Sequence, residues 1–335
     1  MKYPVYIGGY SKSLFRGEFD ETAGTLEILD SLDVTSPSYV CTDGDILYGV
    51  SETDKFEINS GALFSVSAPE NGKMSLISIQ STNGRHPCHL CVNDEHVFAA
   101  NYSEGTLSIF KRKTNGEVEP SYISIAHYGK GIDPGRQEKA HIHFVTKTPD
   151  NRYLAVCDLG LDKVFLYPYS KESGLSTEAR IILCPPGSGP RHLVFSDDGK
   201  TIYVLAELSS RIFVFEDTGE DILLKQDISI LPDGFKGENT AAAIHISPDA
   251  GHVAASNRGH DSIAVCKIKD DKTLEEPEYI KTGRTPRDFR YSPGGSWILS
   301  ANQNDNSITI HSTCKDNKTT GKTDVQSPTC ITFGT

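Results

Sequence analysis

Hydrophobic and polar positions recur along this chain in one pattern about every 50 residues. Each copy has a short apolar strand, an Asp/Gly turn, a second strand, a small polar loop and a third strand. Clear copies cover residues 87–110, 141–167, 190–215, 241–266 and 286–311, and weaker copies begin at Pro37 and Pro328. A period of this length with three or four short strands per unit predicts a β-propeller. Two stacked β-sandwiches, the alternative all-β interpretation, would not require one phrase to recur in register.

The copy at residues 190–215 illustrates how each unit is built. Leu193 and Phe195 supply the apolar positions of its first strand, a turn follows at 197–199, and further strands are predicted at 202–206 and 212–215. Asp and Gly suit the turn, whereas β-branched and aromatic residues suit a pleated, half-buried surface. The polar stretch 216–231 leaves room for a fourth, outer strand. We therefore expect about four antiparallel strands per blade.

Counting the starting points of the phrase gives the number of blades. They are Pro37, Pro87, His141, Pro190, Ala241, Pro286 and Pro328. Because the last phrase has a single strand before the chain ends, segments 3–10 and 14–20 are predicted to complete that blade and pair its open edge. No Pro/Gly/Ser-rich linker interrupts the repeats. We expect one domain over residues 1–335, an all-β, seven-bladed β-propeller whose last blade is closed by both termini.

Charge and composition restrict the partners and the location. A formal net charge of −12 disfavours nucleic acid or an anionic membrane as the main partner, but a local basic pocket could still bind a small anionic substrate. The N-terminus lacks a signal-peptide pattern, and no apolar run approaches about 18 residues. The eight cysteines are scattered rather than spaced as a disulfide framework. We expect a cytoplasmic protein, and nothing in the pattern implies an oligomer.

Two motifs that suggest metal or cofactor chemistry have simpler structural explanations. Cys88 and Cys91 lie three positions apart on a predicted strand, so their thiols would point to opposite faces, and no second CxxC completes a ligand set. The GSGPR segment at residues 187–191 leads into a strand and therefore offers phosphate no helix N-terminus. We expect neither a metal nor an organic cofactor.

The repeat brings polar residues from separate blades to one edge. The start of each first strand and the end of each second strand meet at the same edge of a blade, around one mouth of the central channel. Polar residues at strand starts are His89, His143, Arg191 with His192, and Arg287, and those at strand ends are Asn101, Asp158, Glu207, Asn257 with Arg258, and Asn302. His141 and His143 alternate along one strand, so only one of them is expected to face the channel.

Structural roles are the alternative for several of these residues. One slot recurs at the strand ends and holds Asn101, Asp158, Asn257 and Asn302, which is typical of turn-forming residues that bond their own backbone. Charges at Arg191, Glu207 and Arg258 would be costly at the inner ring unless they are solvated and paired. A purely structural ring of salt bridges is therefore the alternative to a binding site. His192 faces either the channel or the interior of its blade.

Several phrases resemble a known family when they are taken together. HIHFVTKTPDNRYLAVCDLG, GPRHLVFSDDGKTIYVLAEL, SNRGHDSIAV and TPRDFRYSPGG are similar in order and spacing to the seven-bladed lactonase family, which includes bacterial propeller 6-phosphogluconolactonases and the fungal carboxy-cis,cis-muconate cyclase. The resemblance covers nearly the whole chain and implies a metal-independent site at one channel mouth. The positions it assigns to that site are His143, Arg191, Glu207, Arg258 and Arg287. The chain departs from the family at Ala243, where an acidic residue is frequent.

The resemblance implies hydrolysis of a lactone, which requires an attacking water, a base, and donors for the oxygen that becomes anionic. Arginine suits that oxygen and also binds carboxylate or phosphate. Glu207 beside several arginines would be firmly ionised and a weak base, whereas histidine titrates near neutral pH. We therefore expect His143 to be the general base and acid, Glu207 to orient water, and Arg191 and Arg258 to bind the oxyanion. The predicted substrate contacts are Arg287, His192, His89 and Asn257.

The predicted substrate is a sugar-acid lactone, first of all 6-phosphogluconolactone, which would be hydrolysed to 6-phosphogluconate. A muconate-type lactonising cyclase could use the same histidine, glutamate and arginines, and a non-catalytic propeller that binds a ligand at its face is a third interpretation. A calcium-dependent propeller lactonase is disfavoured because no set of carboxylates and amides resembles a cation cage.

Overall fold

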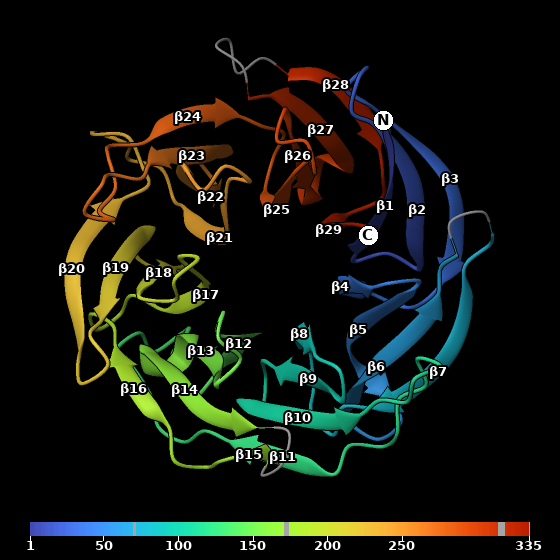
Figure 1. Ribbon diagram of the computed structural model, residues 1–335, viewed down its shortest axis with the longest axis horizontal. Coiled ribbons are helices and arrows are strands. Elements are labelled where there is room, and N and C mark those ends of the chain that lie inside the picture. The colour runs from blue at the N-terminus through green and yellow to red at the C-terminus, as the bar shows by residue number, and fades with distance from the viewer. Residues whose placement is uncertain (70–71, 171–173, 314–318, 335) are drawn as a thin grey trace. The chain divides into compact units, whose positions relative to one another are not determined.

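The computed structural model describes residues 1–69, 72–170, 174–313 and 319–334, and nearly all regular structure in these ranges is β-strand. Two short 3₁₀ turns, η1 (Leu159–Leu161) and η2 (Gln303–Asp305), are the helical elements in them. In the described part of the chain, no helix is long and apolar enough to span a membrane. The strands there pair into seven antiparallel sheets (Figure 1), so the predicted all-β fold of seven blades with about four strands each is confirmed.

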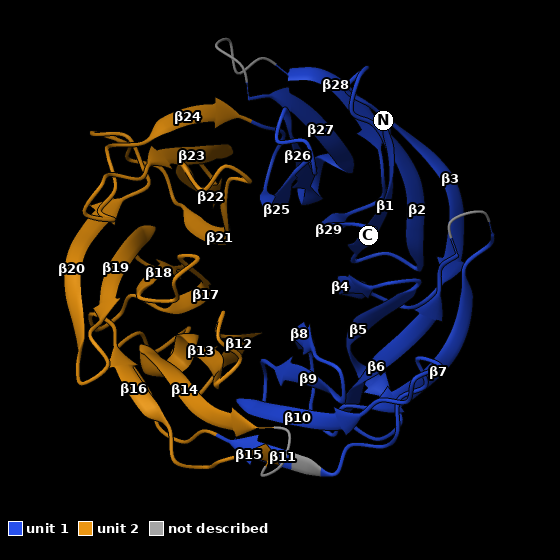
Figure 2. Cartoon of the chain, viewed as in Figure 1, with its two compact units in different colours: residues 1–126, 282–335 blue, residues 127–281 orange. Residues whose placement is uncertain are grey.

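The chain divides into two compact units (Figure 2), residues 1–126 with 282–335, and residues 127–281. The first unit holds four sheets in its described residues. One consists of β4 (Pro37–Asp43), β5 (Ile46–Phe56), β6 (Ser60–Ser67) and β7 (Ser75–Ser81), and the next of β8 (Pro87–Val92), β9 (His96–Asn101), β10 (Thr106–Lys111) and β11 (Ile123–Ala126). A third consists of β25 (Pro286–Tyr291), β26 (Trp297–Asn302), β27 (Ser307–Ser312) and β28 (Thr319–Asp324). The single domain expected over residues 1–335 stays a prediction.

The fourth sheet of this unit joins the two ends of the chain. Its strands are β29 (Pro328–Phe333), β1 (Lys2–Gly9), β2 (Ser13–Asp20) and β3 (Thr25–Asp33). β29 pairs antiparallel with β1, with Phe333 opposite Val5 and Ile331 opposite Ile7. Ile331 is fully buried in a cluster with Val5, Ile7 and Phe19. The predicted closure of the last blade by both termini is therefore confirmed.

The second unit holds three sheets in its described residues. The first consists of β12 (Ile142–Lys147), β13 (Tyr153–Asp158) and β14 (Lys163–Ser170), with β15 (Gly174–Leu175) and β16 (Arg180–Leu183) both pairing with β14. The others are β17 (Pro190–Phe195), β18 (Thr201–Ala206), β19 (Arg211–Asp217) and β20 (Ile222–Ser229), and β21 (Thr240–Ile246), β22 (His252–Arg258), β23 (Ser262–Lys267) and β24 (Glu278–Lys281).

Strand β18 explains why the end of the second strand is a firm support for a site. Its side chains alternate between two apolar cores, because Val204 packs in the cluster shared with β13 and β14, whereas Leu205 packs in the cluster shared with β22 and β23. Both residues are fully buried. Since neither face of β18 meets solvent, the residue that follows it, Glu207, leaves a rigid element in a fixed direction.

The first strand of each sheet contains an irregularity at the same place. Its pairing with the second strand skips one residue, or two in β21, just after the strand begins, as in a β-bulge. The skipped residues are Ser38, Cys88, His143, Arg191, Ala242 with Ala243, Arg287 and Thr329. A bulge redirects a side chain locally, so this repeated position places His143 and Arg191 differently from their neighbours.

The polar residues that recur at the end of the second strand make other hydrogen bonds than predicted, except for Asp158. Asn101 donates to the hydroxyls of Thr106 and Ser108 on the third strand, and Asn302 donates to Thr309 in the same way. The side-chain amide of Asn257 donates to the carbonyl of Ile230, at a distance of 2.8 Å. The expectation that these asparagines bond their own local backbone was therefore wrong, because the third strand and the incoming connection lie closer. Asp158 does fit it, since it accepts from the backbone N–H of Leu161, at 3.2 Å.

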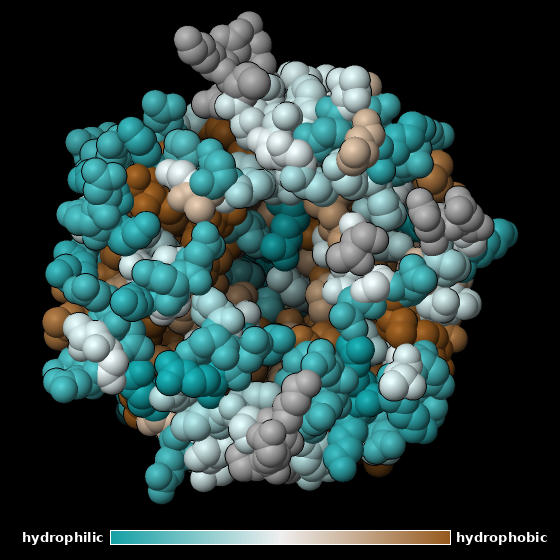
Figure 3. Space-filling view, in the orientation of Figure 1, coloured by the Kyte–Doolittle hydropathy of each residue, from teal (hydrophilic) through white to brown (hydrophobic). Residues whose placement is uncertain are grey.

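Several of the large apolar side chains that are exposed among the described residues lie on the third or fourth strand of a sheet. They include Leu76 and Ile79 on β7, Ile181 and Leu183 on β16, and Leu223 and Leu224 on β20. On the face seen in Figure 3, hydrophilic residues cover most of the outer surface and apolar residues lie between them in separate areas. Scattered exposed apolar residues of this kind are normal for a folded protein.

Candidate active site

The candidate site of the second unit is built around the carboxylate of Glu207, directly after β18. Its backbone is fixed on both sides, because its N–H donates to the carbonyl of Gly189 at 2.8 Å and its carbonyl accepts from the N–H of Ala241 at 3.0 Å. These bonds connect the sheet that contains β18 to the loop before β17 and to the start of β21. The Glu207 side chain is only 4% exposed, so its charge must be compensated within the protein.

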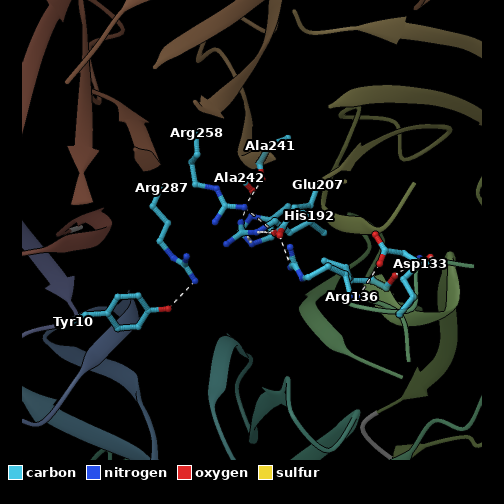
Figure 4. A network of polar contacts seen from close by, with 12 residues as sticks. Tyr10, Asp133, Arg136, His192, Glu207, Ala241, Ala242, Arg258 and Arg287 are labelled. Atoms are coloured by element: carbon cyan, nitrogen blue, oxygen red, sulfur yellow. Dashed lines mark hydrogen bonds and ion pairs between the residues drawn. The ribbon is translucent and has the colours of Figure 1, made fainter. Parts of the chain in front are cut away.

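Two buried arginines share one oxygen of this carboxylate. Nε of Arg191 lies 2.8 Å from Oε2 of Glu207. An Nη atom of Arg258 lies 3.0 Å from the same oxygen (Figure 4). The arginine side chains are 3% and 13% exposed. Each guanidinium group also donates to a carbonyl of β21, Arg191 to that of Ala242 and Arg258 to that of Ala241, at 2.9 Å for the second. The backbone at the start of β21 therefore accepts from both arginines, at the paired Ala241 and at the skipped Ala242.

The electrostatics of Glu207 follow from this arrangement. Burial by itself would raise the pKa of Glu207, but the charges of Arg258 and Arg191, with those of His143 and Arg136, outweigh it and hold that pKa well below its ordinary value. The carboxylate is therefore ionised throughout the neutral range. A permanently ionised carboxylate can accept hydrogen bonds and orient water, but it is a weak base.

His143 and His192 lie side by side near this cluster. Their rings meet edge-on, with centroids 5.5 Å apart, and both side chains are buried. His192 also packs against Phe144, at 4.7 Å between centroids, and its Nε2 accepts from Arg191 at 3.0 Å. Because arginine can only donate, Nε2 of His192 carries no proton in this arrangement. The charge of His143 is among the main causes that lower the pKa of Glu207.

His141 has separate contacts, which resolves the alternation between the two histidines of this strand. Nε2 of His141 lies 3.2 Å from Oε1 of Glu138, and the backbone N–H of His141 donates to Asp158 at 2.9 Å. Asp158 in turn lies 2.7 Å from Nδ1 of His127. His143, at the skipped position of β12, is thus the one associated with Glu207.

Arg136 completes the cluster and was not found by sequence reasoning. It lies in the connection between β11 and β12, and one of its Nη atoms is 2.6 Å from Oε1 of Glu207 (Figure 4). The backbone of this segment is tied at a turn, where Asp133 accepts from the N–H groups of Gly135 and Arg136 at 2.8 and 3.1 Å. Sequence reasoning missed Arg136 because it considered residues at strand ends. The Asp-Pro-Gly turn signal at residues 133–135 was the local cue.

Asp162 joins this segment to the GSG loop that precedes Arg191. Its carboxylate accepts from the N–H groups of Gly187 and Gly189, at 2.7 and 2.8 Å, and from the amide of Gln137 at 2.8 Å. Gln137 is fully buried and donates in addition to the carbonyl of Leu159 at 2.8 Å. The glycine loop thus cradles a carboxylate of its own chain, and one residue positions the supports of both Arg136 and Arg191.

Three predicted site residues have other surroundings. In the first unit, Arg287 donates to the hydroxyl of Tyr10 at 2.7 Å and lies over its ring, and Tyr10 donates to Glu52 at 2.8 Å. The ring of His89, in the same unit, packs at a tilt against that of Tyr39, with centroids 4.0 Å apart. In the second unit, the amide of Asn257 donates to Ile230, as described above, and accepts from Asn239 at 2.8 Å.

Strand pairing clarifies two of these assignments. Cys88, not His89, occupies the skipped position equivalent to His143, and His89 corresponds instead to His192. Tyr10 and Glu52 occupy the same position in their sheets as Glu207 does in its own. In each sheet this residue directly follows the one that pairs with the proline opening the first strand. Sequence reasoning missed both, although this register was the available signal. Within the described residues, no group of three or more His, Cys, Asp or Glu side chains is arranged to hold a metal ion.

Consecutive antiparallel sheets of four or five short strands are typical of the blades of a β-propeller, and the comparisons agree. The family model described as "Lactonase, 7-bladed beta-propeller" matches residues 4–333. A 6-phosphogluconolactonase of Bacillus subtilis is 31% identical over 353 residues, covering 99% of this chain and 98% of the relative. The solved structure of a periplasmic gluconolactonase of Pseudomonas aeruginosa has a TM-score of 0.93 and 30% identity, covering 100% of this chain and 99% of that one.

A solved protein from Lactobacillus plantarum is similar to the same extent, with a TM-score of 0.91 and 30% identity over 99% of both chains. The chain belongs to the lactonase family of seven-bladed β-propellers. The predicted family, fold class and enzyme class, that of a lactone hydrolase, are therefore confirmed.

Proposed function

We propose that this protein hydrolyses a sugar-acid lactone, 6-phosphogluconolactone first of all, to the open-chain acid in the cytoplasm. The observation that carries the proposal is the ionised Glu207 carboxylate, held by Arg191, Arg258 and Arg136 beside the His143 imidazole. Such a cluster offers the three things that lactone hydrolysis needs: a proton acceptor, an oriented water and cationic donors for an oxyanion. The names of the Bacillus subtilis and Pseudomonas aeruginosa relatives support a sugar-acid lactone as substrate.

The reaction begins with water attacking the carbonyl carbon of the lactone. His143 takes one proton from that water as the new carbon–oxygen bond forms, and the carbonyl oxygen becomes an oxyanion. The intermediate then collapses, the bond from carbon to the ring oxygen breaks, and His143 returns the proton to the departing oxygen. The products are a carboxylic acid, which ionises at neutral pH, and an alcohol on the same molecule. No oxidant, reductant or further reactant is consumed.

Arg191 and Arg258 stabilise the oxyanion in this scheme. A single preorganised donor to an oxyanion typically contributes roughly 3 kcal/mol to the transition state. Both guanidinium groups are held by Glu207 and by carbonyls of β21, so little reorganisation is needed when the negative charge develops. Glu207 orients the water rather than deprotonating it, because its lowered pKa makes it a weak base.

The substrate contacts beyond this cluster stay predictions. His192, which is bonded to Arg191, is the best supported of them. Arg287 and His89 are proposed as substrate contacts from the sequence and the family resemblance. Asn257 is the weakest candidate, since both ends of its amide are already bonded within the unit.

Hydrolysis is tested by following acid release at constant pH with 6-phosphogluconolactone and with unphosphorylated gluconolactone. We expect acceleration above the spontaneous rate for at least one of the two, unchanged by a chelator. Acceleration of neither lactone would overturn the proposal. Lactonisation of a carboxymuconate in a parallel assay would identify a cyclase instead, and activity that is lost to a chelator and restored by calcium would identify a calcium-dependent lactonase.

A further inference from the structure

The guanidinium groups around Glu207 are not equivalent. Arg191 and Arg258 share Oε2, whereas Arg136 lies on the other oxygen, Oε1, at 2.6 Å. The Arg136 side chain is 40% exposed, against 3% and 13% for the other two. A cation that already contacts solvent loses less hydration on meeting a ligand than one that must first be uncovered. Arg136 is therefore the member of the cluster best able to meet an incoming anion.

The backbone that carries Arg136 is held firmly, although its side chain is exposed. The next residue, Gln137, is fully buried and its amide bonds Leu159 and Asp162. On the other side, Asp133 caps the N–H of Arg136 itself. The guanidinium group can thus reorient on its own flexible stem while its attachment point stays fixed. The backbone of Arg136 is thus preorganised, whereas its guanidinium group can adapt to a ligand.

The two buried arginines have further partners that hold them in place. Arg191 and Arg258 each use donors on backbone carbonyls of β21 in addition to Glu207, which fixes their orientation. Guanidinium is the side chain that best matches the oxygens of a phosphate or a carboxylate, because it offers paired donors. A phosphate monoester would compete strongly for it, since it carries up to two negative charges against the single charge of Glu207.

We propose that Arg136 is the receptor for the anionic substituent of the substrate and sets the preference for lactones that carry one. The proposal rests on the lactonase function proposed above. When Arg136 turns to the substituent, Oε1 of Glu207 gives up this contact and can bind the attacking water instead. In this proposal a single movement of the Arg136 side chain both binds the substituent and exposes Oε1 of Glu207.

The test compares ligands that differ only at carbon 6. Gluconate, glucarate and 6-phosphogluconate share the carboxylate at carbon 1 and carry a hydroxymethyl, a carboxylate or a phosphate monoester at the other end. Their affinities are measured by calorimetry for the wild type and for Arg136→Gln, Arg136→Lys and Arg152→Gln. Arg152 is the control because it is an exposed arginine of the same unit that pairs with Asp150 instead.

We expect the wild type to bind 6-phosphogluconate at least about tenfold more tightly than gluconate, as charge-assisted bonds to phosphate allow. Arg136→Gln should reduce this ratio by at least about tenfold, Arg136→Lys should reduce it less, and Arg152→Gln should leave it unchanged. Tight binding of glucarate as well would indicate that Arg136 binds any anionic group, whereas tight binding of 6-phosphogluconate alone would indicate that it selects phosphate. The ratio of kcat/KM for phosphorylated and unphosphorylated lactone should follow the same order.

An unchanged ratio in Arg136→Gln, or no preference for either anionic ligand in the wild type, would overturn the assignment. Melting curves of each variant establish that the protein is folded. The binding comparison needs no turnover, so it tests Arg136 even if the protein hydrolyses neither lactone. Failure of the receptor and failure of the proposed reaction are therefore distinguishable.

Discussion

Replacing Glu207 with glutamine removes one negative charge from between three guanidinium groups and keeps the size of the side chain. The lost contacts are the ion pairs of Oε2 with Arg191 and Arg258, at 2.8 and 3.0 Å, and of Oε1 with Arg136, at 2.6 Å. Because Glu207, Arg191 and Arg258 are nearly closed to water, the variant leaves positive charge buried without its compensating carboxylate. We therefore predict that Glu207→Gln lowers the free energy of unfolding of the protein.

The size of the effect follows from burial. Removing one partner of a buried ion pair costs about 3–5 kcal/mol, whereas exposed pairs are worth about 0–1 kcal/mol. Arg136 adds little because it is 40% exposed. We expect a loss of about 3–5 kcal/mol for Glu207→Gln. The matched control is Asp150→Asn, which removes a carboxylate paired with Arg152 through side chains that are 45% and 75% exposed, and it should lose about 1 kcal/mol or less.

Urea unfolding followed by far-UV circular dichroism measures both variants. The pH dependence has a definite sign, because the folded pKa of Glu207 lies below its ordinary value of 4.5. The stabilisation is fully present above about pH 4.5 and is lost as the pH falls through the folded pKa, so the gap between wild type and Glu207→Gln should shrink only in acid. Equal losses in the two variants, or a gap that does not change in acid, would refute the electrostatic reasoning.

Two further predictions concern the first unit. Deleting β29 from Pro328 onward removes the partner of β1 and the buried Ile331, so the truncated protein should unfold or aggregate; a monomer that melts like the full chain in calorimetry would contradict the closure. Burial lowers the pKa of His311 to about 4, so its neutral form should stabilise the fold above about pH 6.5 and this contribution should be lost toward pH 4, by about 3 kcal/mol. His311→Gln should flatten that pH dependence in urea titrations, and an unchanged slope would exclude His311 as its source.

The repeat made most of the fold predictable. Pro87, Pro190 and Pro286 open their first strands as expected, because proline lacks a backbone N–H and the first position of a strand does not require one. The polar turns that follow these strands fix the hairpins. The pairing of β29 with β1 could be inferred because one strand alone cannot complete a blade.

The site was predictable only where it follows the repeat. His143 and Arg191 share the skipped position, and Glu207 follows the second strand, so their convergence could be read from the phrase. Arg136 lies in a connection without a repeat, and its ion pair with Glu207 spans 71 positions, which no local pattern encodes. His89 was grouped with His143 because the two phrases were aligned from Pro87 and His141, whereas the strand pairing makes Ile142 the equivalent of Pro87.

The role of the Glu207 cluster is tested by measuring hydrolysis of 6-phosphogluconolactone near neutral pH by the wild type, His143→Gln and Glu207→Gln, with Arg152→Gln as the control for an exposed charge. If His143 moves the proton and Glu207 orients the water, each of the first two variants loses at least about tenfold in kcat/KM, in line with the usual contribution of acid–base groups, and the control loses nothing. Full activity in both His143→Gln and Glu207→Gln would show that this cluster does not perform the reaction.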